Sequence, residues 1–323
     1  MQPPRVAWHG GARFAFTVFD DTDGMDLVNG PPVYRLLSEL GCRITKSVWP
    51  VAPSRPTVPG GLTCDYPGYL RWVRDLAEEG HEVGLHGATS EPSPRARTRR
   101  ALDRFTELFG HHPRIGADHG GNREALYWGP ARLSGARGRL YRRATQLTRP
   151  ERVAFEGHLP RSPYFWGDLC RQRIDYWRNF SFTAANLLRP CPVLPYHDPA
   201  RPYVNWWFAS THAPTIEPFL DLVRPGRLDR LEEEGGVCIV YTHFGTDFAP
   251  AGRLDPRFVG ALRDLTERDA WFAPASEVLD HLRSQQATSL LTDRDRGRLE
   301  RRWIADHLRT RGGTELRRLR RPA

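Results

Sequence analysis

The chain has 323 residues, a formal net charge of +9, 39% hydrophobic residues and 11% aromatic residues. This composition is that of a globular protein with a substantial core, and it excludes an intrinsically disordered chain. It contains no run of 18 apolar residues, so we expect no membrane span.

Much of the positive charge lies at the C-terminal end. Residues 292–323 contain eleven Arg and five acidic residues, so this segment supplies +6 of the net +9. Lys46 is the only lysine, which indicates Arg-favouring codon usage rather than a phosphate-binding groove. We therefore expect no nucleic-acid partner. The basic tail is interpreted as a solvated helix, with peripheral contact to acidic lipid headgroups or to another protein as the alternative.

The cysteines and the N-terminus bear on localisation. The five cysteines are an odd set without a C-x-x-C pair, which fits reduced thiols better than a disulfide framework or a zinc finger. The first residues, MQPPRVAWHGG, lack the apolar core of a signal peptide. We therefore expect a cytoplasmic protein.

Strand and helix patterns alternate along the first part of the chain. Strands are predicted where apolar and β-branched residues cluster, and helices where apolar residues recur every three or four positions. The predicted strands are 14–20, 42–51, 81–87 and 114–120, and the predicted helices are 32–41, 67–80 and 94–110, followed by a helical or turn-rich segment at 122–133.

The middle of the chain is less regular, and the alternation returns after it. Within 135–235 we predict one strand at 153–158, and we interpret 162–180 and 194–208 as aromatic-rich loops. Strands are then predicted at 235–245 and 270–276, and helices at 256–269 and 277–286. This order predicts a parallel α/β fold, either an open sheet or a barrel, over residues 1–285. Residues 286–323 form the Arg-rich tail, which we expect to be helical or partly disordered.

Polar residues stand at the ends of four predicted strands. The first strand ends in Asp20 and Asp21, the third in His86, the fourth in Asp118 and His119, and the strand at 235–245 in His243. In parallel α/β folds these ends gather at one edge, where functional groups collect. Each residue taken alone is as easily a solvated turn or a structural histidine. Taken together they predict a divalent-metal site, since Asp oxygen and His nitrogen both suit zinc and other first-row ions.

Periodicity separates two histidines of the third strand. His81 and His86 are five positions apart, so on one strand they point to opposite faces. We assign His86, at the strand end, to the site and His81 to a structural role.

Several of these stretches resemble the NodB-like polysaccharide deacetylases, carbohydrate esterase family 4. The matching stretches are FAFTVFDD, GHEVGLHG, VYTHFG and WFAPASEVLDHL, and the resemblance covers residues 12–285. It implies a distorted (β/α) barrel that removes acetyl groups from sugars with a divalent metal, which we expect to be zinc. It also implies that Asp20 is the general base, Asp21 and His86 are metal ligands, and His243 is the general acid.

The chain departs from the family pattern at three places. Ser90 stands where the second ligand histidine is expected, the arginine of the third motif is missing near 116–122, and Thr22 replaces a glycine. We predict that His119 replaces the lost ligand. Asp118 and the aromatic residues Trp166 and Trp206 are predicted to bind substrate, although packing is an equally good interpretation of the aromatic residues.

These residues predict the chemistry of the site. A metal polarises the acetyl carbonyl and activates a water, Asp20 accepts the water's proton, and His243 protonates the leaving group. The predicted partner is an acetylated sugar or glycan precursor in surface-polysaccharide metabolism. The alternative is a degenerate member of the family that binds a glycan without hydrolysing it.

Overall fold

The computed structural model describes residues 4–58, 60–148, 154–286 and 290–319. These residues form eight strands, all parallel within one sheet: β1 (Phe14–Asp20), β2 (Thr45–Val48), β3 (Glu82–Leu85), β4 (Ile115–Gly116), β5 (Tyr176–Phe182), β6 (Trp206–His212), β7 (Val237–Thr242) and β8 (Ala270–Phe272). The seven strands β1 to β7 close into a barrel, because β1 pairs with both β2 and β7. The predicted (β/α) barrel is therefore confirmed.

Strand β8 completes the barrel wall at one end. β1 pairs with β2 only at its last residues, Phe19 and Asp20, whereas β8 pairs with β1 at residues 14–16. The turn after β8 then reaches β2, since Ala275 N donates to Thr45 Oγ1 at 2.8 Å. β8 thus fills the space where β1 and β2 diverge.

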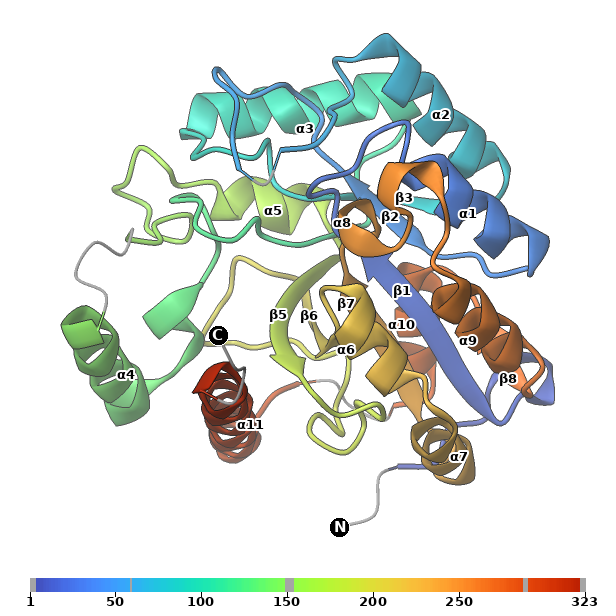
Figure 1. Ribbon diagram of the computed structural model, residues 1–323. Coiled ribbons are helices and arrows are strands. Elements are labelled where there is room, and N and C mark those ends of the chain that lie inside the picture. Colours follow the sequence, from blue (N-terminus) through green and yellow to red (C-terminus); the bar gives the residue numbers. More distant parts are fainter. Residues whose placement is uncertain (1–3, 59, 149–153, 287–289, 320–323) are drawn as a thin grey trace.

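Helices cover the outside of the barrel (Figure 1). Their bounds are α1 (Gly30–Glu39), α2 (Pro67–Glu78), α3 (Arg95–Phe109), α4 (Gly135–Thr148), α5 (Gly167–Arg173), α6 (Ile216–Leu222), α7 (Pro225–Glu233), α8 (Phe244–Asp247), α9 (Pro256–Thr266), α10 (Ala275–Ser284) and α11 (Asp293–Leu319). Short 3₁₀ turns are η1 (His9–Gly11), η2 (Gly129–Arg132) and η3 (Pro250–Gly252). No helix of the described residues is long and apolar enough to cross a membrane.

The middle of the chain differs from the sequence-based expectation. β5 and β6 begin inside the two segments that we interpreted as aromatic loops and extend beyond them, and the two strands pair with each other. The strand predicted at 153–158 does not form over its described residues, 154–158. Instead, Gly157 O accepts hydrogen bonds from Trp166 N and Gly167 N, which fixes a loop below α5.

The first part of the basic tail packs against the barrel. Leu299 and Trp303 of α11 belong to the hydrophobic core, and Trp303 lies 5.5 Å from Phe180 of β5 between ring centroids. Glu300 is fully buried and accepts hydrogen bonds from Ser134 N and Arg137 Nε. Residues 287–289 and 320–323 of the expected tail lie outside the described residues.

Candidate metal and catalytic site

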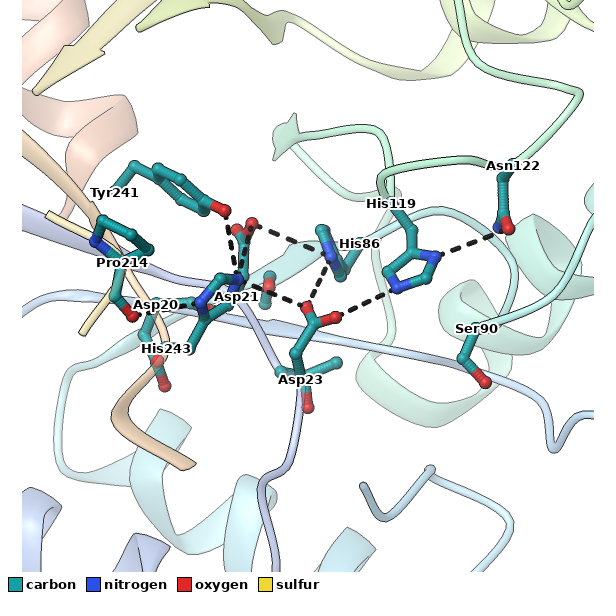
Figure 2. Close-up of polar contacts among 12 residues, drawn as sticks. Asp20, Asp21, Asp23, His86, Ser90, His119, Asn122, Pro214, Tyr241 and His243 are labelled. Carbon is teal, nitrogen blue, oxygen red and sulfur yellow. Dashed lines mark hydrogen bonds and ion pairs between the residues drawn. The ribbon is translucent and has the colours of Figure 1, made fainter. Parts of the chain in front are cut away.

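Polar side chains from four strand ends meet at the mouth of the barrel (Figure 2). Asp21 and Asp23 follow β1, His86 follows β3, His119 lies three residues after β4, and His243 follows β7. Because all strands are parallel, their C-terminal ends share one edge. The structure therefore brings together Asp21, His86, His119 and His243, and adds Asp23, which we had not selected.

Asp23 is the centre of the cluster. His86 Nε2 lies 2.9 Å from Asp23 Oδ2, and His119 Nε2 lies 3.0 Å from Asp23 Oδ1. All three side chains are buried. Burial alone would raise the pKa of Asp23, but the charge of His86, together with the charge and hydrogen bond of His119, outweighs it and holds this pKa well below its usual range. The side chain of Asp23 is therefore ionised although it is buried, and a buried negative charge needs a positive charge beside it.

The donor atoms of Asp23, His86 and His119 are arranged so that one cation could contact all three. Single ligand atoms of these residues lie within 4.8 Å of one another. Asp23 Oδ2 makes no hydrogen bond to a described residue, even though His86 Nε2 is 2.9 Å away. His119 Nδ1 is 3.4 Å from Asn122 Oδ1, so the other nitrogen, Nε2, faces the cluster. A carboxylate oxygen and two imidazole nitrogens are a usual ligand set for zinc, so these residues fit a first-row divalent ion.

Asp21 faces the barrel interior and pairs with an arginine from the opposite wall. Arg178 of β5 donates to Asp21 Oδ1 and Oδ2 at 2.9 and 2.6 Å. Both side chains are buried, and the guanidinium lies 4.3 Å from the ring centroid of Tyr241. Asp21 Oδ2 is 3.7 Å from His86 Nε2, so it borders the cluster.

Sequence reasoning missed Arg178 because its strand was interpreted as a loop. The stretch YWRNFSF places Arg178 and Asn179 between aromatic residues, which obscures the alternation of a strand. One signal was available in the sequence. A buried aspartate at the site needs a positively charged partner, so the absence of an arginine from the third motif indicated that another arginine would take its place.

His243 stands beside both aspartates. Its Nε2 lies 3.7 Å from Asp23 Oδ2 and 4.0 Å from Asp21 Oδ2. Its Nδ1 is 3.1 Å from the carbonyl oxygen of Pro214, which can only accept a hydrogen bond. The proton therefore resides on Nδ1, and Nε2 faces the site and lies 3.2 Å from the Tyr241 hydroxyl.

Asp20 points away from the cluster, toward α1 and β2. Its Oδ2 accepts from Tyr34 Oη at 2.7 Å and lies 3.3 Å from Lys46 Nζ, and its Oδ1 accepts from Phe244 N at 2.8 Å. Burial raises the pKa of Asp20 against the opposing effects of Lys46, the Phe244 amide and Tyr34. Adjacent residues on a strand point to opposite faces, so Asp20 and Asp21 cannot both face the barrel interior. This geometry does not suit the expected role of Asp20 as general base.

Ser90 lies outside the cluster. Its hydroxyl is 2.6 Å from Thr57 Oγ1, in the long loop between β2 and α2. His119, in contrast, borders the cluster, with Nε2 3.0 Å from Asp23 Oδ1.

The three residues expected to bind substrate are engaged elsewhere. Asp118 accepts from Leu126 N and from Trp177 Nε1, and burial raises its pKa to about 7. Trp166 is 1% exposed and donates its indole hydrogen to Glu124 O. Trp206 begins β6 and therefore lies at the end of the barrel opposite the site. Asp118 and Trp166 are therefore engaged in buried hydrogen bonds, and Trp206 lies away from the mouth.

Comparisons with known proteins bear on the fold. No family model matches the chain, and no curated protein matches it. A solved structure assigned to the polysaccharide deacetylases, from Mycobacterium smegmatis, superimposes with a TM-score of 0.53 at 15% identity, covering 90% of this chain and 98% of its own. Another, from Pseudomonas aeruginosa PAO1, gives a TM-score of 0.50 at 14% identity, covering 88% and 95%. The chain has the fold of the polysaccharide deacetylases, as the sequence resemblance implied.

Proposed function

We propose that this protein is a metal-dependent deacetylase that hydrolyses the amide or ester of an acetylated sugar or glycan precursor in surface-polysaccharide metabolism. The observation that carries the proposal is the convergence of Asp23, His86 and His119 on one point at the barrel mouth, with Asp21 and His243 beside it. The fold shared with polysaccharide deacetylases supports the substrate class.

Asp23, His86 and His119 would hold the ion, and zinc suits this ligand set best. When bound, such an ion polarises the acetyl carbonyl and lowers the pKa of a water in the site. Asn122 fixes the imidazole of His119, because its side-chain oxygen lies beside Nδ1. This assignment moves the carboxylate ligand from Asp21, as the resemblance implied, to Asp23.

Asp21 takes the role of general base in place of Asp20. It is the carboxylate beside the ligand cluster that no histidine approaches within 3.5 Å, and Arg178 holds it in one orientation through two hydrogen bonds. A base held in this way accepts the proton of the attacking water without reorientation of its carboxylate.

His243 takes the role of general acid. The carbonyl of Pro214 fixes the ring, and Nε2 points into the site. The proton that leaves the attacking water can reach this nitrogen, because Asp21 Oδ2 lies only 4.0 Å from it. Nε2 then delivers a proton to the departing amine or alcohol.

Metal titration and activity measurements test the proposal together. In calorimetry with zinc, Asp23→Asn should lose binding, while Asp21→Asn should retain it. Both variants should release no acetate from acetylated sugars. Ser90→Ala is the matched control and should keep zinc binding and activity. Undiminished zinc binding by Asp23→Asn would overturn the ligand assignment, and wild-type activity in Asp21→Asn would overturn the assignment of the base.

The alternative, a degenerate protein that binds a glycan, rested on Ser90 and on the missing arginine. Both gaps have a counterpart in the structure, His119 for the ligand and Arg178 for the arginine. The hydrolase is therefore the better proposal. A zinc-loaded protein that binds acetylated sugars but releases no acetate would favour the alternative.

A further inference from the structure

Helices α4 and α11 pack against each other on the outside of the barrel (Figure 1). Arg137 of α4 donates to Glu300 of α11 at 2.7 Å, and the rings of Tyr141 and Trp303 are 5.8 Å apart. These contacts place the two helices next to each other, so their outer faces lie on neighbouring parts of the protein surface.

The exposed residues of these two helices are strongly cationic. Six arginines are solvent-exposed and make no ion pair with a described residue: Arg139, Arg142, Arg143, Arg294, Arg301 and Arg309. Helix α4 contains no acidic residue at all. The sequence after residue 309 adds five more arginines and one glutamate.

The four acidic residues of α11 before residue 310 do not offset this charge, because other groups engage them. Glu300 is buried between Arg137 and Arg201, and Asp306 accepts from Thr183. Asp293 and Asp295 pair with Arg296 and Arg298 of the same helix.

Two large apolar side chains stand among the arginines. Leu140 is 70% exposed and Leu308 is 65% exposed, and within the described residues only Val58 is a more exposed large hydrophobic. Leu140 lies three residues before Arg143 on α4, and Leu308 lies seven residues after Arg301 on α11, so both are on the cationic faces. A leucine exposed beside arginines can enter the boundary between headgroups and acyl chains while the arginines contact the headgroups.

We propose that this surface binds peripherally to membranes that contain anionic phospholipids. We call it the α4–α11 surface, and it consists of Arg139, Leu140, Arg142, Arg143, Arg294, Arg301, Leu308 and Arg309. The arginines attract the negatively charged headgroups, and the leucines insert at the boundary between headgroups and acyl chains. A nucleic acid would use the arginines equally well, but it offers the leucines no apolar environment. The inference concerns helices that supply none of the proposed metal ligands, and it does not depend on the proposed deacetylase activity.

Vesicle sedimentation tests the inference on the full-length protein. Wild type should bind vesicles of phosphatidylcholine with 30% phosphatidylglycerol and should not bind pure phosphatidylcholine. Arg139→Glu/Arg143→Glu/Arg301→Glu should weaken binding by about 100-fold or more, since each arginine near an anionic surface contributes on the order of a fivefold increase in affinity. The matched control, Arg71→Glu/Arg99→Glu/Arg100→Glu, alters three exposed arginines elsewhere and should bind as wild type does.

Two further measurements decide between partners. Leu140→Ser/Leu308→Ser keeps the charge and should weaken vesicle binding several-fold, about the effect expected when two apolar anchors are lost. A 30-base-pair DNA duplex serves as the competing polyanion. The inference is overturned if wild type binds the duplex but not the vesicles, if both charge-reversal triples lose vesicle binding equally, or if the leucine variant binds vesicles as tightly as wild type.

Discussion

Replacing Arg178 by Met should destabilise the protein strongly, because it leaves the charge of Asp21 buried without a partner. Arg178 is 4% and Asp21 2% exposed, and two hydrogen bonds of 2.9 and 2.6 Å join them. Breaking a buried ion pair from one side costs about 3–5 kcal/mol. Met fills much of the space of the arginine stem, so loss of packing contributes little to this cost.

The double variant Asp21→Asn/Arg178→Met separates the charge from the packing. With the aspartate neutralised, no buried charge remains, so the double variant should be more stable than Arg178→Met alone. The coupling between the two positions should be about 2–3 kcal/mol, at the upper end of values for residues in one network. Arg178→Lys keeps the charge but loses the two-pronged geometry, so it should cost less than Arg178→Met.

Urea unfolding followed by tryptophan fluorescence measures these differences. The protein should be treated with a chelator first, because a bound cation would compensate Asp21 in part and reduce the effect. The reasoning would be refuted if the two substitutions were additive within about 0.5 kcal/mol, the value expected of independent sites.

Three other predictions concern stability. The pKa of His81 is lowered to about 4, because burial and the nearby charge of Arg43 oppose its charged form. The stability that His81 contributes above pH 6.5 should be lost as the pH falls toward 4, by about 3 kcal/mol, and His81→Gln should reduce the acid-side loss in urea titrations by this amount. The pKa of Glu124 is raised to about 7 by burial. Its contribution to stability should therefore fall by about 3 kcal/mol as the pH rises from about 4.5 to 7, and Glu124→Gln should show a smaller total fall than wild type, because the similar contribution of Asp118 remains. Trp303→Ala should lower the free energy of unfolding by about 3–5 kcal/mol, because this side chain of α11 is buried in the core; an effect below about 1 kcal/mol would show that α11 is not part of the folding unit.

The barrel could be predicted from the sequence because each of its strands is marked by a local run of apolar and β-branched residues. Runs such as FAFTVFD and VCIVYT are buried on both faces, and such near-continuous apolar runs are typical of strands in parallel sheets. Strand β5 lacks this pattern because it contains two buried polar residues, Arg178 and Asn179. Arg178 is stabilised by a residue distant in the chain. A local pattern cannot show that the charge of Arg178 is neutralised by Asp21, 157 positions away.

The same limit explains which part of the site was predicted. The histidines were identified because each stands at a strand end, a position visible in the sequence. The geometry favours a different choice among the aspartates from the one that the resemblance implied, because side chains alternate along the chain. Asp21 and Asp23 are two positions apart and both border the histidines, whereas Asp20, the last residue of β1, contacts Tyr34 and Lys46.

This arrangement gives Asp20 a positioning role at the site. Its carboxylate accepts from the amide of Phe244, the residue directly after His243, while its backbone continues into Asp21. One buried side chain therefore ties the turn that carries both site aspartates to the turn that carries the histidine.

In Asp20→Asn, Oδ1 can still accept from Phe244, so acetate release should fall modestly and zinc binding should persist. In Asp20→Ala this link is lost, and kcat should fall much further than in Asp20→Asn. Equal kcat values for the two variants would show that the link does not position the site.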